Sequence, residues 1–114
     1  MIKTDQAVEE FLRQTLVGVI STIDKNSHPR TAPIWFHWEK GAAYMFTDRN
    51  SLKWRNIQHN PHASLCVDWR EPPYRSVILD GLVEEVDRPL HELVLMMALR
   101  YYGDKVGVEF AQEY

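Results

Sequence analysis

Five short segments rich in β-branched and aromatic residues constrain the fold of this chain more than any other feature. They are residues 16–24, 30–38, 42–47, 62–69 and 75–87. Turn-prone sequences, DKNSHP and then Lys40-Gly41, join the first three, which is typical of β-hairpins. Because helical segments do not alternate with the strands, a parallel doubly wound sheet is not expected. The sequence instead predicts an antiparallel sheet or small barrel with helices packed outside it.

Three helices are expected around these strands. Apolar residues recur at helical spacing in residues 4–16 and again in residues 50–60, where an Asn-Pro pair ends the pattern. A third helix is expected at about residues 89–102, because proline is tolerated at a helix start and Gly103 follows the last helical position.

Three single residues within the predicted strands carry further expectations. Pro33 predicts a bulge or an unpaired edge position, because proline cannot donate to a β-ladder. Gly81 predicts a bulge or a kink in the last strand. Cys66 is the single cysteine of the chain and lies in an apolar stretch, so a buried structural thiol in a reducing compartment is expected.

Length and composition limit the possible functions. The 114 residues are expected to form one domain, residues 1–114. No apolar run approaches the roughly 20 residues of a membrane span, and the N-terminal sequence does not resemble a secretory signal. A cytoplasmic protein is therefore expected. The net charge of -3 gives no general attraction to nucleic acid, and the histidine spacings do not predict a metal site.

The stretch TDRNSLKWRN is basic where a helix is expected to begin. The N-terminus of a helix carries partial positive charge, which disfavours cations such as Arg49, Lys53 and Arg55. A bound anion would reverse that repulsion, and the Thr47 and Ser51 hydroxyls would add hydrogen bonds to the free backbone amides. The stretch therefore predicts an anion site, with a solvated basic helix face as the alternative.

The order of the motifs resembles a known superfamily. The runs VGVISTIDKNSHPRTAPIWF, YMFTDRNSLKWRNIQHNPHASLCVDW and RSVILDGLVEEVD are similar to the pyridoxamine 5'-phosphate oxidase-like, flavin-binding split-barrel proteins. The small branch that includes deazaflavin (F420)-dependent reductases is the most similar. The resemblance implies a mainly β fold, namely a split β-barrel of antiparallel Greek-key type with helices.

The resemblance also implies a cofactor site. In that superfamily the cofactor phosphate lies at the end of the third strand and the start of the next helix, and the ring lies along the second strand. Carried over to this sequence, the implied cofactor-binding residues are Arg30, Thr31, Ala32, Pro33, Ile34, Trp35, Phe46, Thr47, Ser51, Lys53, Asn56 and Ser76. Because Pro33 has no N–H, contacts there must come from carbonyls or flanking amides.

These residues also have ordinary structural interpretations. Arg30 is also explained as a surface residue beside a turn, and Asn56 as a partner of the helix end. Ser76 is also explained as a plain strand serine, although the oxidases tend to have a ring-contacting glutamine there. Three tryptophans are also explained as core or interface aromatics: Trp35, Trp38 and Trp54.

The sequence departs from the oxidases at three points. Leu52 stands where they have an arginine before the phosphate-binding lysine, although Arg55 is a possible substitute. The chain ends at AQEY without their Arg-x-His segment, so true pyridoxamine phosphate oxidase activity is not expected. The family usually has one more strand after the second helix, and this sequence does not predict it.

The function expected from the sequence is hydride transfer between a noncovalently bound flavin-type cofactor and a small organic substrate. FMN is the first expectation for the cofactor and F420 the alternative, and no catalytic residue is predicted. The alternatives are a non-catalytic flavin or haem carrier, or a single-stranded nucleic-acid binder that would use Trp35, Trp38, Trp54 and Arg55. The resemblance further implies a homodimer with the cofactor between the subunits, with neither nucleic acid nor membrane as partner.

Overall fold

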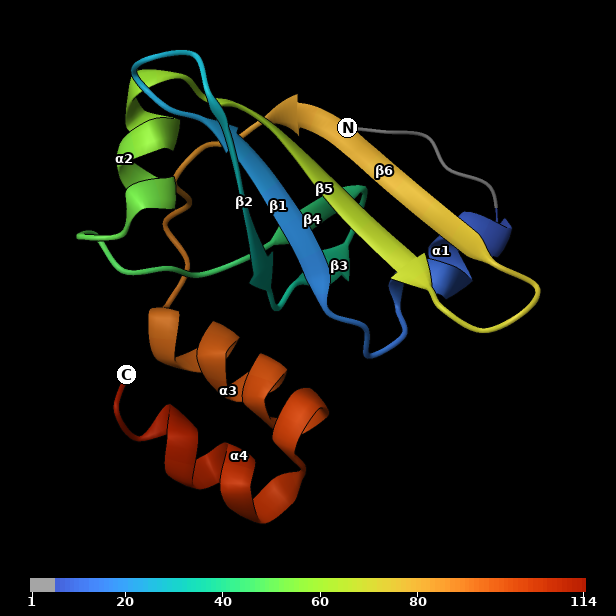
Figure 1. Cartoon of the computed structure of the whole chain (residues 1–114). Helices are drawn as coiled ribbons and strands as arrows, with labels where there is room; N and C mark the ends of the chain where they lie inside the picture. Colours follow the sequence, from blue (N-terminus) through green and yellow to red (C-terminus); the bar gives the residue numbers. More distant parts are fainter. Residues whose placement is uncertain (1–5) are drawn as a thin grey trace. The chain divides into compact units, whose positions relative to one another are not determined.

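A computed structural model describes residues 6–114 of the chain (Figure 1). The described residues divide into two compact units. The first ends at Glu84 and contains every described strand, and the second, Glu85–Tyr114, is helical. All residues proposed from the sequence as cofactor contacts belong to the first unit.

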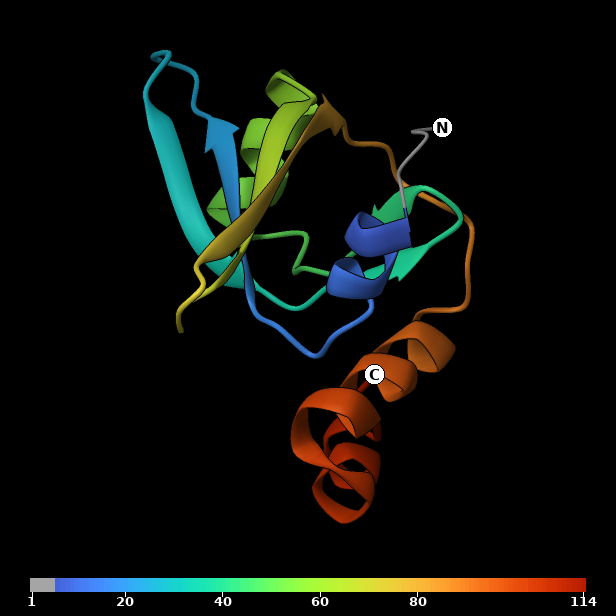
Figure 2. The same ribbon diagram turned by 90° about the vertical axis from the view of Figure 1, so that its right-hand side faces the viewer.

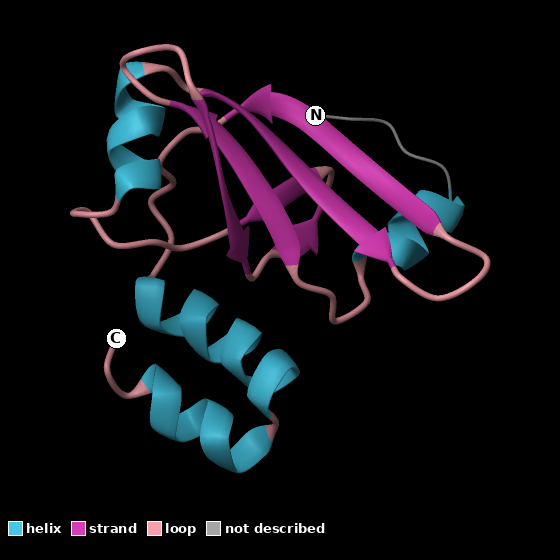
Figure 3. Cartoon of the chain, in the orientation of Figure 1, coloured by secondary structure: helices cyan, strands magenta, loops and turns pink. Residues whose placement is uncertain are grey.

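Four strands form the main sheet of the first unit. They are β1 (Gly18–Ile23), β2 (Pro29–Ile34), β5 (His62–Trp69) and β6 (Arg75–Leu82). They lie in the order β2-β1-β5-β6, and every neighbouring pair is antiparallel, so β2 and β6 are the edges of this sheet (Figures 1 and 3). The antiparallel arrangement predicted from the sequence is confirmed.

A separate two-stranded sheet consists of β3 (His37–Glu39) and β4 (Ala42–Tyr44). The prediction of one strand over residues 30–38 is therefore wrong, because the chain leaves the main sheet after Ile34. Phe36, which is fully buried, lies in the crossing segment. The strand expected at residues 42–47 ends at Tyr44. The two sheets do not join into a closed barrel, as Figure 2 shows, which is the open arrangement of a split barrel.

Two helices complete the first unit, α1 (Gln6–Leu12) and α2 (Leu52–His59). The first expected helix, residues 4–16, begins outside the described residues and ends four residues early. The apolar sides of the helices pack with both sheets around one core, which contains Phe11, Leu12, Ile20, Phe36, Trp38, Ile57, Leu65 and Val67. Among the described residues, no helix has the length and apolarity that crossing a membrane requires.

The two faces of the main sheet differ in burial. Along β1, Ile20 and Thr22 are buried against the core, while the residues between them lie on the opposite face. Cys66 lies on that opposite face and is half-buried, so the prediction of a buried thiol is wrong. Gly81 pairs in register with Ala63, and the register continues without interruption to Leu82, so the predicted bulge is absent.

The second unit consists of α3 (Leu90–Tyr102) and α4 (Asp104–Ala111), which pack against each other (Figure 1). Gly103 separates them with a φ of 84°, a conformation that favours glycine. Gly107 allows close packing, because a Cβ at this position would lie 2.7 Å from the carbonyl oxygen of Ala98. The prediction of α3 is confirmed, whereas α4 was not expected from the sequence.

Candidate functional site

The start of α2 brings two hydroxyl groups together. Ser51 is the N-cap residue, and its Oγ accepts a hydrogen bond from the backbone N–H of Trp54 at 3.2 Å. The hydroxyl oxygens of Thr47 and Ser51 are 3.1 Å apart and share one hydrogen bond. The two hydroxyls carry two protons, and the hydrogen bond between them uses only one. The other O–H can therefore donate to a ligand. The juxtaposition expected from the sequence is present.

Further donors surround these hydroxyls. The backbone N–H of Trp54 is capped by Ser51, and that of Arg55 donates to the Ser51 carbonyl, which leaves the amides of Leu52 and Lys53 at the helix start. No acidic residue occupies the first turn of α2. Within residues 6–114, Lys53 has no carboxylate within ion-pairing distance. The ammonium of Lys53, free amides and a hydroxyl form a donor set that suits a phosphate.

Asn56 holds α2 on the main sheet. Its side chain is buried, and its Nδ2 donates to the Oγ1 of Thr22 on β1 at 3.1 Å. Its backbone carbonyl accepts from the N–H of Asn60 at the end of the helix. The structure therefore shows Asn56 joining α2 to β1 through a buried side-chain hydrogen bond.

The turn between β1 and β2 orients Arg30. The Oδ1 of Asp24 accepts from the backbone N–H groups of Asn26 and His28, both at 2.9 Å, and its Oδ2 accepts from the Nε of Arg30 at 3.0 Å. These contacts, the amide of His28 first among them, hold the pKa of Asp24 below its ordinary value of 3.8 despite opposing desolvation. The carboxylate therefore stays ionised and fixes one side of the guanidinium.

Arg30 lies on the same face of the sheet as the α2 anchor. It pairs with Thr22 across the β1–β2 ladder, so both side chains leave the same face, and Thr22 is the residue that Asn56 contacts. The Nε of Arg30 bonds to Asp24, whereas the terminal nitrogens of Arg30 have no partner within the described part of the chain. Its planar fork is available to an anion on this face.

The second strand, β2, turns alternate side chains toward the core and toward solvent. Ala32 and Ile34 turn their side chains to the core, while Thr31 and Pro33 are exposed. β2 is an edge strand, which is one of the two outcomes predicted from Pro33. Figure 2 shows β2 at the outer edge of the main sheet.

Trp35 follows β2 directly, and its ring meets that of Phe46. The two rings pack edge to face, with centroids 6.3 Å apart. Because Phe46 immediately precedes Thr47, this aromatic pair adjoins the hydroxyl cluster in the sequence. Trp35 and Phe46 are thus brought together, as expected of residues that serve one ligand.

Ser76 lies at the opposite end of the main sheet from Thr22, the same end as Ile34. It pairs with Asp68, beyond the last rung that joins β5 to β1 at Gly18. Thr22, which anchors α2, is about 13 Å farther along β1 at roughly 3.3 Å per residue. Within one chain, Ser76 therefore does not join the α2 cluster.

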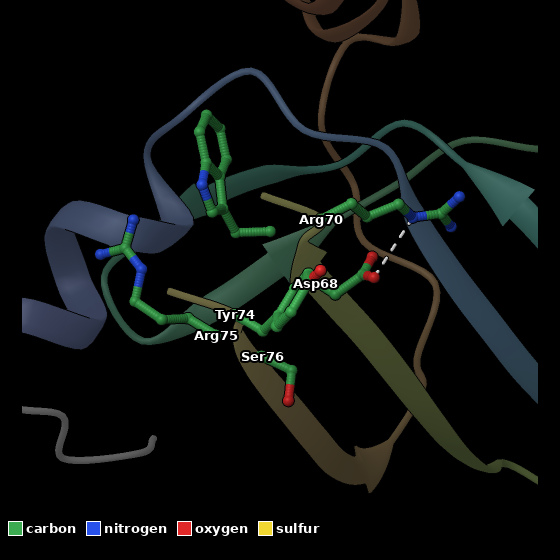
Figure 4. A pocket seen from close by; sticks show the side chains of 6 residues that line it. Asp68, Arg70, Tyr74, Arg75 and Ser76 are labelled. Atoms are coloured by element: carbon green, nitrogen blue, oxygen red, sulfur yellow. Dashed lines mark hydrogen bonds and ion pairs between the residues drawn. The ribbon is translucent and has the colours of Figure 1, made fainter. Parts of the chain in front are cut away.

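Ser76 instead lines a shallow cavity of about 390 Å³ beside the β5–β6 turn. Figure 4 shows Arg70 and Arg75 pointing away from each other on either side of Tyr74. The guanidinium of Arg75 lies over the ring of Phe11 at 5.3 Å, and Arg70 donates to Asp68 at 3.2 Å. The two cations therefore do not converge on one anion in this cavity.

Two functional groups escaped the sequence reasoning. Asp24 was grouped with the turn DKNSHP, although the side chain of an Asp at the start of a turn commonly accepts from the backbone N–H two residues on. Thr22 looked like an ordinary β-branched strand residue, and its partner Asn56 is 34 residues away. No local pattern predicts such a contact.

Comparison with known proteins places the chain in a family. The profile of the pyridoxamine 5'-phosphate oxidase family matches residues 4–113, nearly the whole sequence. The chain belongs to the pyridoxamine 5'-phosphate oxidase family. A pyridoxine/pyridoxamine 5'-phosphate oxidase of Anaplasma phagocytophilum (strain HZ) is 32% identical over 77 residues, which cover 67% of this chain and 37% of that protein. The match thus spans less than half of that relative.

Solved structures support the same assignment. An F420 reductase matches with a TM-score of 0.79 and 28% identity, over 89% of this chain and 81% of that one. HutZ, the haem storage protein from Vibrio cholerae, matches with a TM-score of 0.69 and 17% identity, over 97% and 83% of the two chains. At 17% identity the second match shows the fold alone. Members of the pyridoxamine 5'-phosphate oxidase family share this split-barrel fold, and the expectation from the sequence is confirmed for family and fold.

Proposed function

We propose that this protein binds a phosphate-bearing flavin-type cofactor, FMN or F420, and transfers hydride between that cofactor and a small organic substrate. The observation that carries the proposal is the cluster at the start of α2. There Lys53, which has no carboxylate partner among residues 6–114, adjoins free amides and the hydroxyls of Thr47 and Ser51. Family membership and the F420 reductase match support the flavin-type assignment.

The residues of the chain have separate tasks in this proposal. Lys53, Ser51 and Thr47 hold the phosphate, and the terminal nitrogens of Arg30 add charge from the neighbouring strand. The outer edge of β2 and the pair formed by Trp35 and Phe46 position the ring. The bound cofactor supplies the hydride chemistry, while the protein orients it and limits access of water.

We also propose that the site is completed by a second copy of the chain. An apolar row crosses the face of the main sheet that is turned away from the core, running through Pro33, Val19, Cys66 and Ile78, which are paired neighbours in register. Ile78 is 62% exposed. A self-complementary apolar band suits an isologous dimer, and a partner could bring its own Ser76 to the cofactor.

Titration of the apo-protein tests the proposed cofactor. FMN and F420 are added separately and followed by fluorescence, and haemin is titrated as a comparison by its visible absorption. Micromolar binding of a flavin-type cofactor supports the proposal, whereas binding of haemin alone would replace it with a haem carrier. Turnover with a reduced cofactor and small electron acceptors then separates an enzyme from a carrier.

The Lys53→Ala variant tests the phosphate cluster. We expect it to lose about 1–3 kcal/mol of affinity for FMN, because a charge-assisted hydrogen bond to the phosphate is removed. Its affinity for riboflavin, which lacks the phosphate, should change little. Lys105→Ala removes an equal charge from α4 and serves as the control. Equal losses for FMN and riboflavin would remove Lys53 from the phosphate site.

A further inference from the structure

The hydrogen bonds of the β1–β2 hairpin determine which backbone groups of β2 face outward. The N–H of Asp24 donates to the carbonyl of His28 at 2.9 Å, so this pair is bonded across the hairpin. In an antiparallel ladder bonded pairs recur at every second residue. The register between β1 and β2 is continuous. Arg30, Ala32 and Ile34 therefore direct their backbone groups toward β1.

The alternate residues of β2 direct their backbone groups away from the sheet. They are Pro29, Thr31 and Pro33. The two prolines fit these positions, because a proline has no N–H and costs no ladder bond at an outward position on an edge strand. The composition of the strand thus agrees with the orientation that the hydrogen bonds give.

The outward edge of β2 is consequently poor in donors. Its three outward residues present three carbonyl groups, but only Thr31 presents an N–H. β2 is an edge of the main sheet, so no strand of the described chain uses these groups. A ligand along this edge finds one backbone donor over the length of the strand.

We propose that Pro33 makes this edge selective for a 5-deazaflavin ring over a flavin ring. The inference rests on the proposed function, which places a flavin-type ring along β2, and it includes the proposal that the ring edge with C4 and N5 faces this strand. A flavin has two neighbouring acceptors, the C4 carbonyl oxygen and N5. A 5-deazaflavin keeps the carbonyl and has C–H in place of N5. One N–H on the strand satisfies the deazaflavin and leaves one flavin acceptor unpaired.

Where the proposed second copy closes the site to water, an acceptor that is left without a donor weakens binding. The desolvation of a polar group that finds no partner typically lowers affinity by about tenfold. An alanine at position 33 would restore an outward N–H at the same place on the strand and remove this difference. Pro29 is the matched control, because it also faces outward but lies about 13 Å away along the strand.

The test compares FMN with 5-deaza-FMN, which share the phosphate and the ribityl chain and differ only at position 5. Dissociation constants of both are measured by fluorescence or calorimetry for the wild-type protein, Pro33→Ala and Pro29→Ala. We expect the wild type to bind 5-deaza-FMN about tenfold more tightly. In Pro33→Ala the ratio should fall toward one, and in Pro29→Ala it should stay at the wild-type value.

Each outcome bears on a different claim. Equal affinity of the wild-type protein for the two compounds overturns the role of Pro33, while the proposed function survives because both compounds bind. An unchanged preference in Pro33→Ala, with the variant folded by circular dichroism, also overturns it. Binding of neither compound by the wild-type protein overturns the proposed function and this inference together.

Discussion

At the scale of single residues, Asp24 connects the folding of a turn with the orientation of a candidate ligand group. Its carboxylate accepts two backbone amides of the turn and the Nε of Arg30. All three contacts favour the ionised form, so the pKa of Asp24 is lower in the folded chain than in the unfolded chain. A residue whose folded pKa is depressed stabilises the fold above its unfolded pKa.

Asp24→Asn should make this contribution visible in the pH dependence of stability. Asn keeps one oxygen for the turn amides but loses the charge, so we expect the variant to be less stable than the wild type at pH 7. The difference should shrink as the pH falls from about 4 through the lower folded pKa of Asp24, because the wild-type carboxyl then becomes neutral. Urea unfolding at several pH values measures it. Asp87→Asn, which changes an exposed carboxylate, should show no such convergence.

At the scale of elements, α2 is positioned by one buried polar contact rather than by apolar packing alone. Asn56 and Thr22 are both buried, and they connect the helix to the end of β1. This contact packs α2 against β1, the strand that neighbours β2 and its Arg30 in the sheet. The orientation of the anion donors therefore depends on a hydrogen bond between two uncharged side chains.

Asn56→Ala should destabilise the fold by about 1–3 kcal/mol, because the buried hydroxyl of Thr22 loses its partner. Chemical denaturation measures the change. The double variant Asn56→Ala with Thr22→Val should recover part of the loss, since no unpaired polar group then remains. Additive losses from the two substitutions would show that the hydrogen bond does not couple the helix to the strand.

The sequence predicted some elements closely and missed others for physical reasons. β5 was predicted residue by residue, because residues 62–69 combine β-propensity with clear turn signals on both sides. The break between β2 and β3 was missed, since apolar Phe36 and Trp38 continue a strand pattern while packing into the core. α4 was missed because Gly107 sits in its middle, and only the contact with Ala98 explains that glycine.

The candidate site was predictable in part on the same grounds. Thr47 and Ser51 are close in the sequence, so the local pattern predicted that their hydroxyls lie together at the start of α2. Trp38 was assigned both to the core and to a possible nucleic-acid surface. At 4% exposure, with its Nε1 bonded to Glu9 at 2.7 Å, it cannot stack on a base. Segments that are distant in the sequence bury Trp38, so a local sequence pattern could not predict its burial.

At the scale of the whole molecule, we propose that the site takes groups from more than one chain. Ser76 lies at the opposite end of the main sheet from Thr22 within one subunit. The apolar row through Val19, Cys66 and Ile78 offers a surface on which a second copy could dock. Assembly and cofactor binding should therefore depend on each other.

Ile78→Lys should shift the protein toward the monomer and weaken cofactor binding together. A charge at the centre of an apolar interface is desolvated without a partner, which opposes association. Light scattering measures the mass, and fluorescence titration measures the affinity for FMN. Leu82→Lys, another exposed residue of β6 outside the row, is the control. A wild-type protein that is monomeric at working concentration would contradict the shared site.

The two prolines of β2 have a further consequence for how copies of this protein meet. An open sheet edge with its full set of amides invites strands of other molecules to add to it, which leads to fibrous aggregates. Pro29 and Pro33 remove two of the three amides that such growth would require. The strand can therefore remain uncovered for a small molecule while resisting the uncontrolled stacking of chains.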